Sequence, residues 1–215
     1  MEMKEFYQSE WHFFRTRLLK PFILVSLLFV VTTTVYWLIF STRPDKAFAE
    51  LLSIFKATKL LDAAPFTFKL FIGIFLSNLG KVVFTVALGL IPYFFLPFLI
   101  LLNNASMMGY LLIFLKWKKV NIGLAMASLL PHGILEIPVL LYGISLGLML
   151  CFQLTRRQRQ EKPLLDIKEM KDVPTFDFSL TRVVKIFAFI IAPLLLIAAA
   201  IEAFITPLFM GLFAH

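Results

Sequence analysis

Two ionisable side chains that could do chemistry together lie within a long apolar stretch of the chain. His132 and Glu136 occur in the segment PHGILEIP at residues 131–138. Residues four apart share one face of a helix, so this pair could supply two metal ligands or a general acid and base. It could equally be structural, satisfying backbone groups that Pro131 and Pro138 leave unpaired, or it could line a path for ions. The sequence leaves these three interpretations open.

The supply of further metal ligands is small. A catalytic zinc ion needs about three protein ligands. The other two histidines, His12 and His215, lie near the chain ends, so Glu202 would have to complete such a site. Cys151 is the single cysteine, which excludes a disulfide within the chain and a multi-cysteine metal site. The sequence also lacks the phosphate-loop, H-E-x-x-H and G-x-S-x-G motifs. We therefore predict no catalytic, cofactor or metal site.

The elements that must position these residues are predicted to be membrane helices. The 215 residues are 60% hydrophobic and 16% charged, with a mean hydropathy of +0.88. Soluble domains carry about 25% charged residues, so this chain could not hide its apolar surface from water. The net charge of +8 does not indicate nucleic-acid binding, because the basic residues lie mainly at the ends of apolar runs, where they meet lipid headgroups. We predict a single all-α, polytopic integral membrane domain over residues 1–215.

Five apolar stretches are long enough to cross ~30 Å of hydrocarbon. They predict a bundle of five transmembrane helices near residues 21–40, 67–90, 92–115, 121–153 and 183–212. The fourth stretch could be one kinked span, or a re-entrant piece followed by a span. Within it, Gly143 and Gly147 form a small-xxx-small step that allows helices to approach closely.

Further polar residues stand within the other predicted spans. Asn78 and Lys81 share one span, Asn104 belongs to the next, and Glu202 belongs to the last. Polar groups are costly at membrane depth and usually face the protein interior. A buried Lys81 needs a counter-charge, which Glu136 or Glu202 could provide. We predict that these residues and the His–Glu pair form one buried polar cluster.

Three segments are predicted to lie outside the spans. Residues 1–20 form a helical lead-in or an interfacial helix. Residues 41–66 form a second amphipathic helix, whose apolar stripe contacts lipid or offers a docking surface. Residues 154–182 form a hydrophilic, solvent-exposed loop. Because more lysines and arginines fall on the side of the N-terminus, we expect that end and the 154–182 loop in the cytosol and the 41–66 segment outside.

Three segments resemble the stage II sporulation protein M family of integral membrane proteins. They are LLNNASMMGYLL at 101–112, PHGILEIP at 131–138 and IEAFITP at 201–207. The resemblance runs from about Asn78 to Pro207, and His-Gly-Ile-Leu-Glu is its most specific part. Where many members have Asn-Gly, this sequence has Asn-Asn or Asn-Ala around position 104, and the first 66 residues carry no matching motif.

The resemblance implies five spans and a non-enzymatic role in a membrane complex. The namesake of the family holds peptidoglycan-degrading enzymes at the septal membrane during engulfment. We therefore expect a scaffold or partner subunit in the cell membrane, with lipids and other envelope proteins, such as wall hydrolases, as partners. One alternative is the membrane subunit of an ATP-driven exporter, contacting a cytosolic ATPase through the 154–182 loop. Another is an intramembrane hydrolase that uses His132 and Glu136.

Overall fold

The described part of the chain is a bundle of helices. The computed structural model describes residues 3–58, 66–93, 95–120, 132–161 and 180–208. By length and composition, five helices in this part can cross a membrane: Met3–Phe40, Phe68–Leu88, Pro97–Trp117, Gly133–Arg156 and Thr181–Leu208. The all-α bundle of five spans is confirmed, with span boundaries that differ from the predicted ones by only a few residues at most ends.

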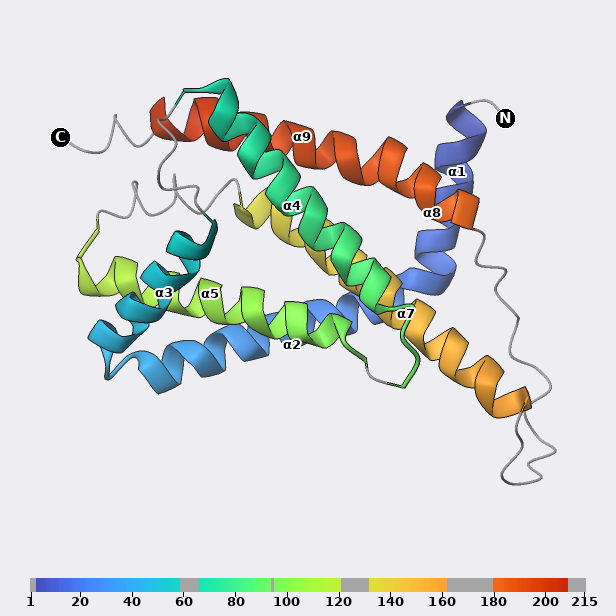
Figure 1. Cartoon of the computed structure of the whole chain (residues 1–215), viewed down its shortest axis with the longest axis horizontal. Coiled ribbons are helices and arrows are strands. Elements are labelled where there is room, and N and C mark those ends of the chain that lie inside the picture. Colours follow the sequence, from blue (N-terminus) through green and yellow to red (C-terminus); the bar gives the residue numbers. More distant parts are fainter. Residues whose placement is uncertain (1–2, 59–65, 94, 121–131, 162–179, 209–215) are drawn as a thin grey trace.

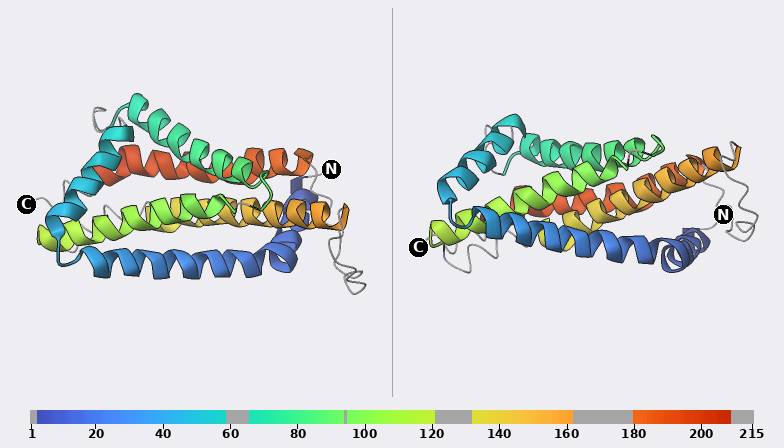
Figure 2. Two further views of the ribbon diagram at one scale, coloured as in Figure 1. Left: turned by 60° about the horizontal axis from the view of Figure 1, so that its bottom comes forward. Right: turned by 90° about the horizontal axis from the view of Figure 1, so that it is seen from below.

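The central helix of the bundle is α7 (Ile137–Glu161). In the most apolar 18 residues of its span, 61% of the residues are buried, against 33% or less in each of the other four spans. Figure 2 shows α7 and α5 (Pro97–Trp117) in the middle layer, with α2 (Leu19–Phe40) on one side. On the other side lie α4 (Phe68–Leu88) and α9 (Ala192–Ala200). Residues on α7 therefore contact every layer of the bundle.

The two ends of the bundle carry different elements. We call one the α1 end: it holds α1 (Met3–Phe13), the end of α4, the last turns of α7 and α8 (Leu180–Ile186) (Figure 1). The other is the α3 end, which holds α3 (Pro44–Thr58) and the last turn of α5. The predicted start of the loop at residue 154 is too early, because α7 continues as a helix to Glu161. Residues 162–179 of the predicted loop lie outside the described part.

Each π-helical turn in the described residues precedes a proline. These wide turns are η1 (Phe14–Leu18), η3 (His132–Glu136), η4 (Phe187–Ile191) and η5 (Ile201–Ile205). They end two or three residues before Pro21, Pro138, Pro193 and Pro207 respectively. Proline donates no backbone hydrogen bond, and its ring clashes with the carbonyl four residues earlier. A wide turn moves that carbonyl aside, so the helix can continue through the proline.

The apolar stripe of α3 packs on the bundle. Ala47 and Leu51 are buried in a cluster with Tyr110 and Ile113 of α5. Phe48 stacks on Phe114, with ring centroids 5.4 Å apart. The predicted interfacial helix therefore exists, but the lipid-contact interpretation is wrong for these residues, because α5 covers them. The polar side of α3 remains exposed.

The lead-in helix α1 is also docked onto the bundle. Figure 1 shows α1 running across α8 at a steep angle to α2. Glu10 is buried and forms an ion pair with Arg182 of α8, with the Arg182 Nε 3.0 Å from Glu10 Oε1. The Arg182 guanidinium also lies over the ring of Phe13, 4.3 Å from its centroid. Charge and aromatic contacts thus join the first helix to the start of the last span.

Candidate functional site: a polar cavity inside the bundle

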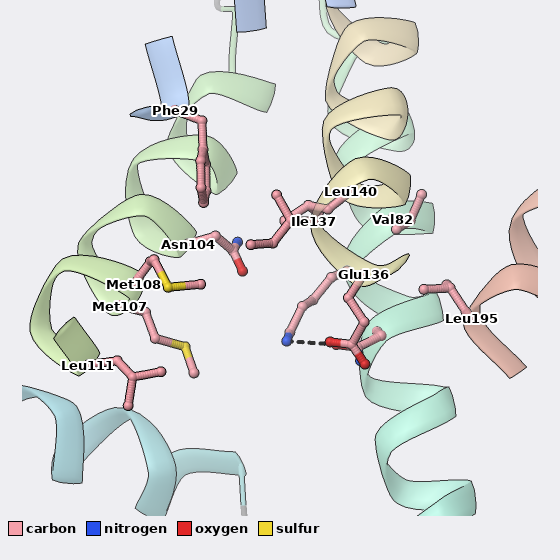
Figure 3. Close-up of a pocket in the computed structure, with 12 residues that line it drawn as sticks. Phe29, Val82, Asn104, Met107, Met108, Leu111, Glu136, Ile137, Leu140 and Leu195 are labelled. Atoms are coloured by element: carbon pink, nitrogen blue, oxygen red, sulfur yellow. Dashed lines mark hydrogen bonds between the residues drawn. The ribbon is translucent and has the colours of Figure 1, made fainter. Parts of the chain in front are cut away.

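Four of the predicted polar residues line one cavity inside the bundle. Asn78, Lys81, Asn104 and Glu136 share its wall, and its volume is about 70 Å³. A polar cavity needs only roughly 10–15 Å³ to hold a water molecule, so this one has room for a small polar group. The rest of the wall is apolar and consists of Phe29, Val82, Met107, Met108, Leu111, Ile137, Leu140 and Leu195. We call this space the Lys81 cavity (Figure 3).

Lys81 supplies a cation to the cavity wall. Its Nζ donates a hydrogen bond of 3.0 Å to Oδ1 of Asn78, one turn earlier on α4, drawn as the dashed line in Figure 3. In the described part of the chain, Lys81 makes no ion pair, since neither Glu136 nor Glu202 has an oxygen within 4.0 Å of its ammonium nitrogen. Glu136 lines the same cavity as Lys81, so it remains the candidate counter-charge at a longer distance, whereas Glu202 does not line that cavity.

Asn104 and Glu136 face each other across the cavity from different spans (Figure 3). The Asn104 amide nitrogen donates to the carbonyl of Ile100, at 2.8 Å. Glu136 is buried, with 9% of its surface exposed, and it ends the π-helical turn η3. The wide turn before Pro138 thus positions the one carboxylate among the residues that line the cavity.

The other two predicted members are placed differently. Glu202 lies in η5, is half-buried and does not line the Lys81 cavity. The backbone of His132 begins η3, but its side chain lies outside the described residues. Among the described residues, no three His, Cys, Asp or Glu side chains lie close enough together to hold a metal ion.

The comparison with family models covers this whole arrangement. The model for stage II sporulation protein M matches residues 25–207. The chain belongs to the stage II sporulation protein M family. The match begins in the first span, so it includes α3 and residues 25–66 of the N-terminal segment, which carries no family motif. No curated protein and no solved structure matches the chain.

A glycine seam on α7 lies beside the cavity in this family member. A Cβ on Gly143 would lie 2.6 Å from Cγ1 of Val82, and one on Gly147 would lie 2.8 Å from the carbonyl oxygen of Thr85. Both contacts are with α4, so the small-xxx-small step allows α4 and α7 to approach closely. Gly89, which follows the last residue of α4, is also packed closely against α7, because a Cβ on it would clash with the backbone of Gly147.

Two charged residues of the fold escaped the sequence interpretation. Glu10 and Arg182 join α1 to α8. Arg182 had been counted only as a basic residue of the cytosolic side, and Glu10 had been given no role. One signal was present, because Glu10 shares a helix face with Phe6 and Phe13, which lie four residues before and three after it. Those two rings are buried, and an acid between them needs a partner from another element.

Proposed function

We propose that this protein is a non-enzymatic partner subunit of a membrane complex in the cell envelope, which holds other envelope proteins at the membrane. Membership of the stage II sporulation protein M family supports a membrane protein, and the namesake's role suggests wall hydrolases as partners. The structural observation that carries the proposal is the placement of α3. Its apolar side is anchored on α5, while Asp45, Lys46 and Glu50 are exposed. A helix fixed in this way offers a rigid polar surface to a partner.

Charge reversal on α3 tests this proposal without disturbing its packing. We expect the double variant Lys46→Glu/Glu50→Lys to lower recovery of co-purified envelope proteins about tenfold, the effect of losing ~1.4 kcal/mol of binding free energy. The measurement is quantitative mass spectrometry after affinity purification from detergent extract. The matched control is Lys4→Glu/Glu5→Lys, which swaps two exposed charges on α1 at the same net charge. Equal recovery from the parent and both variants would remove α3 as the docking surface.

A membrane subunit of an ATP-driven exporter is the second candidate. Two observations favour it: the Lys81 cavity gives the bundle a polar interior, and α7 extends past its span as far as Glu161. That extension could contact a cytosolic ATPase. The genes next to this one separate the two functions, because an adjacent ATPase favours transport and adjacent wall hydrolases favour the scaffold. A hydrolase that uses His132 and Glu136 as zinc ligands is the third candidate, and zinc analysis of the purified protein tests this metal-dependent form.

The proposed function needs a defined orientation in the cell membrane, and we infer that the α1 end is cytosolic. Lysines and arginines of α1, the end of α7 and α8 gather at that end, as the positive-inside rule requires of short cytosolic segments. Single cysteines at the exposed positions Gln158 and Glu50, in a Cys151→Ser background, test this orientation. An impermeant thiol reagent added to intact cells should label position 50 and leave position 158 unlabelled. Labelling of position 158 alone would show that the α1 end lies outside the cell and that the inferred orientation is wrong.

A further inference from the structure

We propose that the Lys81 cavity binds the anionic phosphate or carboxylate group of an amphipathic molecule. The proposal is independent of the scaffold and exporter functions, since it concerns a ligand inside the bundle rather than a partner at its surface. Its basis is the position of the Lys81 ammonium, the hydrogen-bond donors around it and the size of the cavity.

Lys81 is half-buried, and its side chain lines the cavity. Lys81 lies seven residues, about two turns, before Leu88 at the α1 end of α4. A lysine near a membrane surface normally extends its side chain toward that surface. Here the hydrogen bond to Asn78 draws the ammonium the other way, because Asn78 is three residues further from that end. The charge therefore stays at membrane depth, where an unpaired cation is costly.

The cavity offers several hydrogen-bond donors to a bound group, alongside the acceptor oxygens of Glu136 and Asn104. An ammonium has three protons, and Asn78 accepts one of those of Lys81. Because Oδ1 of Asn78 accepts that bond, the amide NH₂ of Asn78 is left to donate. Asn104 uses one of its two amide protons on Ile100, which leaves the other. With no carboxylate in ion-pair distance of Lys81 among the described residues, this donor set suits an anion.

The size and walls of the cavity suit the headgroup of an amphiphile. A volume of about 70 Å³ accommodates one phosphate or carboxylate group rather than a large solute. Met107, Met108 and Leu111 of α5 form an apolar wall beside it, and methionine side chains adapt readily to irregular apolar chains. Glu136 opposes an anion electrostatically, so the proposal predicts that Glu136→Gln tightens binding.

Lipid titration monitored by native mass spectrometry tests the proposal on the full chain in a non-ionic detergent. The probes are phosphatidylglycerol, diacylglycerol with the same acyl chains and inorganic phosphate. We expect phosphatidylglycerol to bind, and Lys81→Met to weaken it about tenfold or more, the effect of removing a charged hydrogen bond. Lys69→Met is the matched control, because Lys69 is exposed at the start of the same helix. It should bind as the parent does.

A second variant keeps the test decisive if Lys81→Met does not fold. Met107→Phe places a bulkier apolar side chain in the cavity while retaining Lys81, and it should also weaken phosphatidylglycerol binding. Binding of inorganic phosphate that depends on Lys81 would support the anion site and identify a free anion as its ligand. The proposal is overturned if diacylglycerol binds as tightly as phosphatidylglycerol, or if neither Lys81→Met nor Met107→Phe weakens binding. Either result would leave the proposed scaffold function standing.

Discussion

Replacing Gly147 by leucine is expected to lower the stability of the whole bundle. A Cβ at this position would lie 2.8 Å from the carbonyl oxygen of Thr85 and 3.0 Å from Cγ of Pro97. One is a backbone atom and the other belongs to a rigid ring, so neither can move aside cheaply. Overpacking of this kind costs about 1–3 kcal/mol. Because α7 is the central helix, forcing it away from α4 and α5 disturbs several interfaces, and thermal unfolding in detergent should shift down by several degrees.

Gly80→Leu is the matched control for this substitution. Gly80 lies on α4, is exposed, and a Cβ there would meet nothing within 4 Å. Leucine at position 80 should leave the unfolding temperature almost unchanged. Gly143→Leu should also lower the unfolding temperature, because its closest contact is a methyl group of the buried Val82, whose side chain has one preferred rotamer in a helix. If Gly147→Leu proves as stable as Gly80→Leu, the close approach of α4 and α7 described here is wrong.

The spans could be predicted from sequence because their signal is local. An uninterrupted apolar run of membrane length, such as residues 21–40, has few alternatives to a transmembrane helix. The turn between α4 and α5 was also predictable, since Gly89 and Pro92 interrupt a run too long for one span. The gathering of Asn78, Lys81, Asn104 and Glu136 in one cavity followed from the cost of polar groups in lipid.

Contacts between distant segments could not be read from the same patterns. An apolar stripe on α3 looks alike whether it faces lipid or protein, and only the position of α5 shows that Ala47 and Leu51 are covered by the chain itself. The ion pair between Glu10 and Arg182 joins residues 172 positions apart. A counter-charge for Lys81 was predicted from the cost of a buried, unpaired cation, but which carboxylate lies near it depends on side-chain distances that sequence spacing does not give.

Glu136 should tolerate glutamine far better than alanine. Its carboxylate is buried at the end of η3 and makes a contact within the chain. Alanine would remove that contact and leave polar neighbours without a partner in a membrane-embedded site, at a cost of about 1–3 kcal/mol. Glutamine keeps the shape and one acceptor oxygen, so it should retain most of the folded yield if hydrogen bonding, rather than charge, holds the turn in place.

The measurement is the monodisperse fraction recovered by size-exclusion chromatography, together with the unfolding temperature in detergent. Glu50→Ala is the control, because it removes an exposed glutamate on α3 by the same substitution. Its monodisperse fraction and unfolding temperature should equal those of the parent protein. Equal losses for Glu136→Gln and Glu136→Ala would show that the negative charge itself is required, which points to a cationic partner for Glu136. No loss for either variant would contradict the inward position of this side chain, because a carboxylate that faces lipid headgroups or water can be removed at little cost.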